Sequence, residues 1–258
     1  LIRAARDYID LQNFILRKDE TGELLLNELL GAARRGVRVR LLLDQMFSFS
    51  DAEYLVRLTL SHRNLEVRFY NPTFYKAKMA KHDWLTGIAC CFRNVNQRMH
   101  NKLLTVDDLI GVIGGRNIAD RYFDFDTNYE FKDRDVLVFG AVATEMRESF
   151  DWFWESPKTV PVQHLRDVAK ELLNGRHEDL QPFEPAPRLL PLLDSYAPPK
   201  RGKHQPMYPY WHLRSDGLWV VPGADELPKQ MNGIPKMGAL RTTRGSLPPQ
   251  VADLLLQR

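Results

Sequence analysis

The chain has 258 residues, of which 44% are hydrophobic and 27% are charged, so it can bury a sizeable core. This composition excludes a disulfide-stabilised miniprotein and an intrinsically disordered chain. No apolar run reaches the length of about 18 residues that is typical of a membrane-spanning helix. Cys90 and Cys91 are adjacent, a spacing that ordinary disulfide geometry disfavours, and we expect two small buried side chains in a reducing compartment.

The net charge of +3 is unevenly distributed along the chain. Residues 181–258 contain ten Lys and Arg against six Asp and Glu, a net charge of +4, which leaves −1 for residues 1–180. A body that binds nucleic acid is expected to carry a basic face of its own. The charge distribution therefore disfavours nucleic acid as a partner.

Strands and helices alternate over the first 70 residues. Patterning predicts strands over 7–16, 37–43 and 65–70, with helices over 21–35 and 51–60 between them. This alternation is typical of a parallel sheet with right-handed crossover connections.

The next elements indicate antiparallel additions to that sheet. Segments 102–106 and 109–113 read as a hairpin, 134–139 as a further strand, and 142–154 and 162–173 as helices. The predicted fold class is therefore α/β, a mixed sheet flanked by helices.

The composition changes near residue 181, because thirteen of the sixteen prolines follow it. We predict a catalytic half-domain over 1–180 and an irregular, Pro-rich tail or divergent segment over 181–258. The opening residues 1–6 read as the end of an amphipathic helix, so we expect the chain to be a fragment, the N-terminal half of a longer enzyme.

One stretch carries residues suited to phosphodiester chemistry, in the spacing H-x-K-x4-D formed by His100, Lys102 and Asp107. On a strand that begins near His100, residues 100 and 102 project from the same face. An imidazole can attack phosphorus or transfer a proton, and a lysine ammonium can neutralise phosphoryl oxygens. Asp107 lies at the predicted hairpin turn, where a hydrogen-bond acceptor that fixes the loop is the simpler role.

The motif continues as Gly114, Gly115, Arg116 and Asn117 at the end of the neighbouring strand. The glycines permit close approach of the backbone, and the Asn117 amide can donate to phosphoryl oxygens. Arg116 can steer an anionic head group, although a surface arginine is the simpler interpretation. We count the two glycines and Arg116 as candidate substrate-binding residues.

With these residues the sequence resembles the phospholipase D superfamily, and within it the bacterial cardiolipin synthase-like members. The resemblance covers Leu1 to about Leu173 and includes the opening ARDYIDLQNF, the AARRGVRVR turn and the block from His100 to Asp120. It implies an enzyme that hydrolyses or transfers phosphatidyl groups without a metal or other cofactor.

The resemblance also implies roles for single residues. His100 or a partner histidine forms a phosphohistidine, while the other histidine is the general acid and later activates the acceptor. Lys102 and Asn117 bind the phosphoryl oxygens. Asp133, in KDRDV before a strand, matches an acidic residue that hydrogen-bonds the catalytic histidine and holds its tautomer.

Members of the superfamily need two such motifs, and this sequence contains one. The second is expected from a homodimer or from a missing C-terminal half. The resemblance further implies a phospholipid substrate and a cytoplasmic protein in peripheral contact with the inner membrane. The alternatives are a homodimeric phosphodiesterase or nuclease, and an inactive fragment.

Overall fold

The computed structural model describes residues 1–123, 125–126, 129–174, 212–213 and 219–220. The chain divides into two units, residues 1–194 and 195–258. In the second unit the described residues form an antiparallel pair of short strands, β8 (His212–Leu213) and β9 (Trp219–Val220). The rest of the predicted irregular tail lies outside the described residues, and the domain boundary at residue 180 stays a prediction.

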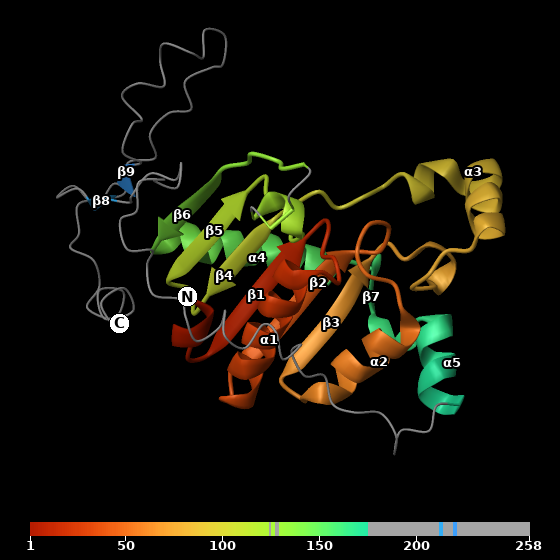
Figure 1. Cartoon of the computed structure of the whole chain (residues 1–258), viewed down its shortest axis with the longest axis horizontal. Coiled ribbons are helices and arrows are strands. Elements are labelled where there is room, and N and C mark those ends of the chain that lie inside the picture. Colours follow the sequence, from red (N-terminus) through yellow and green to blue (C-terminus); the bar gives the residue numbers. More distant parts are fainter. Residues whose placement is uncertain (124, 127–128, 175–211, 214–218, 221–258) are drawn as a thin grey trace, which may run out of the picture. The chain divides into compact units, whose positions relative to one another are not determined.

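A mixed seven-stranded sheet forms the centre of the first unit, in the order β6-β5-β4-β1-β2-β3-β7 (Figure 1). The strands are β1 (Tyr8–Asn13), β2 (Arg38–Asp44), β3 (Leu65–Tyr70), β4 (Leu103–Val106), β5 (Ile110–Gly114), β6 (Asp135–Phe139) and β7 (Thr159–Pro161). β1, β2 and β3 pair in parallel, whereas β4, β5, β6 and β7 join by antiparallel pairing. The predicted α/β mixed sheet is confirmed.

Helices cover both faces of this sheet (Figure 1). They are α1 (Glu20–Arg34), α2 (Ala52–Ser61), α3 (Lys81–Val95), α4 (Ala141–Trp154) and α5 (Arg166–Asn174). Residues of α1, α2 and α5 share one apolar core with β1, β2 and β3, and α4 forms a second core with Leu42, Met99 and Leu103. None of the helices in the described residues is long and apolar enough to cross a membrane.

The start of α1 is joined to the segment that follows the glycine pair. Asp19 caps the helix by accepting from the Gly22 N–H at 3.1 Å, and its second oxygen accepts from the Asp120 N–H at 2.9 Å. Asp120 in turn accepts from the Thr21 N–H at 2.8 Å. These reciprocal hydrogen bonds fix the chain just after Asn117 against a helix that lies 100 residues earlier in the sequence.

α4 is held to the sheet by a buried charge cluster. Asp10 is fully buried and accepts two hydrogen bonds from Arg40, at 2.6 and 2.7 Å. Arg40 also pairs with Asp151 of α4 at 2.7 Å and stacks over the Phe150 ring at 4.7 Å. Burial raises the pKa of Asp10, although Arg40 opposes this shift.

Two elements and one covalent bond differ from the predictions. α3 and the three-residue strand β7 were not predicted. The expectation for the cysteines is wrong, because Cys90 and Cys91 are bonded to each other and Cys90 is exposed. The pair lies where α3 departs from helical backbone, since Cys91 has φ −144° and ψ 28°.

Candidate active site

His100 and Lys102 lie between α3 and β4, and a buried aspartate holds the backbone just before them. Asp44, at the end of β2, accepts from the Met99 N–H at 3.0 Å and from Arg98 at 3.3 Å. Arg98 also donates to the backbone oxygen of Asn71 at 3.0 Å. The position of His100 is therefore tied to the ends of β2 and β3, where parallel α/β sheets commonly place their functional groups.

The structure brings the His100 and Lys102 side chains together. The Lys102 Nζ lies 3.2 Å from His100 Nε2 and 3.3 Å from Nδ1. The expectation that a strand begins near His100 is wrong, because β4 begins at Leu103. The two side chains meet because the lysine folds back, and its Nζ donates to the backbone oxygen of His100 at 2.9 Å.

Burial lowers the pKa of both groups. For His100, partial burial is the larger cause, the positive charge of Lys102 adds to it, and Asp44 opposes it. The pKa of Lys102 is lowered by burial and partly restored by the negative charge of Asp133. At neutral pH the imidazole is therefore neutral, which is the form that can attack phosphorus.

Aromatic rings that the sequence analysis missed line one side of this pair. The Phe14 ring lies 4.6 Å from the His100 ring and 4.9 Å from the Phe47 ring, and Lys102 Nζ is 5.2 Å above Phe14. Phe14 follows β1 and Phe47 follows β2. Their distance from His100 along the chain left no local signal.

A cavity of about 320 Å³ opens beside the pair. It is lined by His100, Asn101, Lys102, Leu103, Ile113, Gly114, Met146 and Ser149. The lining combines the ionisable side chains of His100 and Lys102 with three hydrophobic ones. These are Leu103, Ile113 and Met146. Such a cavity suits a phosphodiester that carries apolar substituents.

The glycine pair lies against β6. The Gly114 N–H donates to the Lys102 backbone oxygen at 3.3 Å, so the two parts of the motif meet across the β4–β5 hairpin. A Cβ on Gly114 would fall 1.9 Å from Asp135 Oδ1, and one on Gly115 would fall 2.5 Å from Asp133 Oδ1. The close approach that the glycines permit is therefore to these two aspartates.

Arg116 contacts the segment that contains Asp133, just before and at the start of β6. Arg116 forms an ion pair with Asp135 at 3.2 Å, donates to the Asp133 backbone oxygen at 3.1 Å and stacks over Phe123 at 5.0 Å. Within the described residues, Asp133 has no hydrogen bond to His100. Its predicted bond to a catalytic histidine stays a prediction, and so does the substrate-binding role of Arg116.

Asn117 is buried, with 5% of its surface exposed. Its Nδ2 donates to the Tyr122 hydroxyl at 2.9 Å, and its Oδ1 has no hydrogen-bond partner in the described part of the chain. That part also contains no hydrogen bond from Asn117 to His100 or Lys102. The role predicted for Asn117 on phosphoryl oxygens stays a prediction.

Asp107 organises the hairpin and the start of β1. Its carboxylate accepts hydrogen bonds from the backbone N–H groups of Arg6, Asp7 and Tyr8, each at 2.9 Å. It lies in the turn between β4 and β5 with φ 52°. Three hydrogen bonds to one carboxylate fit the structural role expected from its place in the turn.

Comparison with known proteins identifies the family of this chain. Residues 1–154 match the family described as cardiolipin synthase, PLD-like domain. The chain is a cardiolipin synthase-like member of the phospholipase D superfamily. Residues 173–258 match a second family, described as ScoMcrA-like, DNA sulfur-binding domain.

Two curated relatives of this phospholipase D superfamily member cover most of its length. An uncharacterized protein of Helicobacter pylori (strain ATCC 700392 / 26695) is 38% identical over 187 residues, which are 72% of this chain and 36% of the relative. Cardiolipin synthase C of Escherichia coli (strain K12) is 35% identical over 211 residues, 77% of this chain and 43% of the relative. The chain thus spans less than half the length of these relatives.

A solved structure is also similar, at lower identity. Nuc from Salmonella typhimurium, a phospholipase D family member, matches 62% of this chain and 84% of its own chain, at 16% identity and a TM-score of 0.39.

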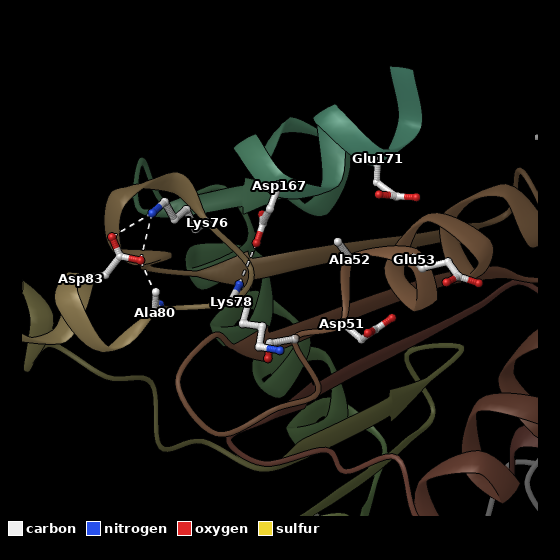
Figure 2. A pocket seen from close by; sticks show the side chains of 10 residues that line it. Asp51, Ala52, Glu53, Lys76, Lys78, Ala80, Asp83, Asp167 and Glu171 are labelled. Atoms are coloured by element: carbon white, nitrogen blue, oxygen red, sulfur yellow. Dashed lines mark hydrogen bonds and ion pairs between the residues drawn. The ribbon is translucent and has the colours of Figure 1, made fainter. Parts of the chain in front are cut away.

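A second cavity, of about 520 Å³, is lined by none of the motif residues. Figure 2 shows the side chains that line it. Three of the five carboxylates that line it have structural partners. Asp83 pairs with Lys76 at 2.8 Å, Asp167 accepts from the backbone N–H groups of Ala77 and Lys78, and Asp51 caps α2. The cavity beside His100 is therefore the candidate active site.

Proposed function

We propose that the chain carries out phosphatidyl transfer or hydrolysis on phospholipids. The observation that carries this proposal is the His100–Lys102 pair, in contact beside a cavity with an apolar wall, within a cardiolipin synthase-like domain. In the reaction a neutral histidine of the site attacks phosphorus, and the bond from phosphorus to the leaving alcohol breaks. Lys102 neutralises the charge that develops on the phosphoryl oxygens.

A second histidine completes the cycle. It gives a proton to the departing alkoxide, then removes a proton from the acceptor hydroxyl as that oxygen attacks the phosphohistidine. The attack releases the product and restores the free imidazole. Because this chain contains one H-x-K-x4-D motif, the second histidine comes from another copy or from a second half in a longer protein.

The acceptor determines which reaction occurs. Water gives phosphatidic acid from phosphatidylglycerol, whereas the hydroxyl of a second phosphatidylglycerol gives cardiolipin and glycerol. The apolar residues Leu103, Ile113 and Met146 that line the cavity disfavour water, and this supports transfer to a lipid hydroxyl.

The test uses vesicles of phosphatidylglycerol and mass spectrometry of the lipid products. Where two copies complete the site, the wild-type chain is expected to form cardiolipin, and His100→Ala is expected to form at least about 100-fold less. His164→Ala, which changes an exposed histidine in the 3-10 helix after β7, is the matched control and should retain the wild-type rate. Equal rates for wild type and His100→Ala would refute the proposal, and absence of product from both would favour an inactive fragment.

A second candidate function rests on the match of residues 173–258 to a DNA sulfur-binding domain. We propose as the alternative that this segment binds DNA that carries a sulfur-substituted phosphate. The site around His100 would then cut the bound DNA. The charge of +4 over residues 181–258 supports it, and the charge of −1 over residues 1–180 argues against it.

Two matched duplexes test the DNA alternative, one with a single phosphorothioate and one without. Tighter binding of the sulfur-containing duplex, together with cleavage that is lost in His100→Ala, would support the nuclease. Equal binding of both duplexes without cleavage would reject it.

A further inference from the structure

Both ends of α3 are fixed by hydrogen bonds to residues that follow β3. Near its start, Asp83 accepts hydrogen bonds from Lys76, at 2.8 and 2.9 Å, and one from the Ala80 N–H at 2.9 Å. Near its end, the Asn71 side chain donates to the Asn94 backbone oxygen at 2.6 Å. Figure 1 shows the helix standing apart from the sheet between these attachments.

Large apolar side chains of α3 point away from these attachments. Leu85 is 71% exposed, Ile88 is 55% exposed and Phe92 is 57% exposed. Leu85 and Ile88 are three residues apart and share one side of the helix, opposite the buried Asp83 and Gly87. Phe92 follows four residues later, just after the bend at Cys91. We call these three exposed side chains the α3 face.

Basic residues are frequent in and next to α3, although Lys76 pairs with Asp83 and Arg98 pairs with Asp44. Between residues 76 and 98 the sequence contains five Lys and Arg and one acidic residue, Asp83. Lys78, Lys81 and Arg93 are exposed. An exposed apolar helix face bordered by basic side chains is complementary to a bilayer surface that carries anionic head groups.

We propose that the α3 face is a membrane-docking surface that inserts between the head groups of an anionic phospholipid bilayer. This inference rests on the proposed lipid substrate and adds to it how the site reaches that substrate. α3 ends at Val95 and His100 follows five residues later, a span of at most about 18 Å of extended chain. Docking of α3 therefore brings the His100 cavity close to the lipid phosphates.

The charge pattern favours a bilayer over a second copy of the chain. A symmetric contact between two α3 faces would bring two clusters of basic residues together, with one acidic residue on each side to offset them. The phosphates of a bilayer neutralise the same residues. Binding to lipid should consequently depend on both anionic head groups and the three apolar side chains.

The experiment measures co-sedimentation of the full chain with vesicles. Wild type is expected to bind vesicles of phosphatidylglycerol and phosphatidylcholine, and to bind vesicles of phosphatidylcholine alone at least about tenfold more weakly. The variant with Leu85→Gln, Ile88→Gln and Phe92→Gln should lose at least about tenfold in binding to the anionic vesicles. Its thermal unfolding should match wild type, since the replaced side chains are exposed.

The control variant replaces three exposed apolar side chains on other helices, Leu60→Gln, Trp152→Gln and Leu173→Gln, which are 55%, 70% and 83% exposed. It should bind anionic vesicles as wild type does. Equal losses in both variants, or none in either, would overturn the inference. A fall in mass by light scattering confined to the α3 variant would also overturn it, because the face would then join two copies.

The His100→Ala variant separates this inference from the proposed function. It should bind anionic vesicles as tightly as wild type, because binding requires no catalysis. Vesicle binding that depends on the α3 face, without any lipid product from wild type, would uphold the docking surface and refute the proposed function. Lipid product from a chain that does not bind vesicles would refute the docking surface and uphold the proposed function.

Discussion

At the scale of single residues, Lys102 influences the site in two ways. Its ammonium group is a positive charge for phosphoryl oxygens, and it also lies 3.2 Å from the imidazole that must stay neutral. Because its charge helps to lower the pKa of His100, the lysine extends to lower pH the range in which the histidine is nucleophilic. One side chain thus serves both binding and activation.

We predict that Lys102→Met raises the pKa of His100 toward 6.5. Removing the positive charge removes one of the two causes of the lowered pKa, while burial, the larger cause, remains. Histidine NMR signals followed against pH, with His100→Ala for assignment, measure the change. Lys170→Met, an exposed lysine in α5, should leave the titration unchanged. A pKa of His100 that stays constant or falls in Lys102→Met would contradict this account.

We predict that Asp107→Ala destabilises the fold by about 1–3 kcal/mol, since three backbone N–H groups lose a charged acceptor. Asp107→Asn should cost less, because one side-chain oxygen remains and asparagine tolerates the positive φ. Urea unfolding measures both, and both folded variants should turn over a chromogenic phosphodiester at the wild-type rate. Lost turnover with unchanged stability would instead indicate a catalytic role.

At the scale of elements, the sequence predicted the sheet well because the strands β1 to β5 bury apolar side chains. It missed α3 because the apolar residues of that helix face outward and its inner side contains Asp83 and Gly87. Hydrophobic periodicity marks a helix that faces a core, and α3 has almost no core to face. The Phe14 and Phe47 contacts were missed for another reason, since tertiary packing alone brings them to His100.

The β5–β6 contact gives a prediction at the same scale. Gly114→Ala should destabilise the fold by about 1–3 kcal/mol, because the new Cβ would fall 2.7 Å from the Arg134 backbone oxygen as well as against Asp135. Gly31→Ala in α1 is the matched control, with no atom nearer than 3.8 Å, and should stabilise by about 0.5–1 kcal/mol. Equal effects in urea unfolding would show that β6 does not approach β5 this closely.

At the scale of the whole molecule, the site is half of what the superfamily reaction requires. The motif residues His100 and Lys102 could be predicted from sequence because they lie two positions apart, and their contact follows from the fold-back of one side chain. The source of the second histidine could not be predicted, because this sequence contains one such motif. Whether two copies supply it is a question about stoichiometry.

Mixtures of wild type and His100→Ala answer that question. If one site takes His100 from each of two copies, an equal mixture after subunit exchange retains about one quarter of the wild-type rate, because one pair in four holds two intact histidines. Independent chains would retain about one half. Mixing wild type with His164→Ala should leave the rate unchanged. The measurement is the turnover rate of the chromogenic phosphodiester at several fractions of wild type. A shared site predicts a rate that varies with the square of this fraction. A rate that varies linearly with it would contradict a site shared between two copies.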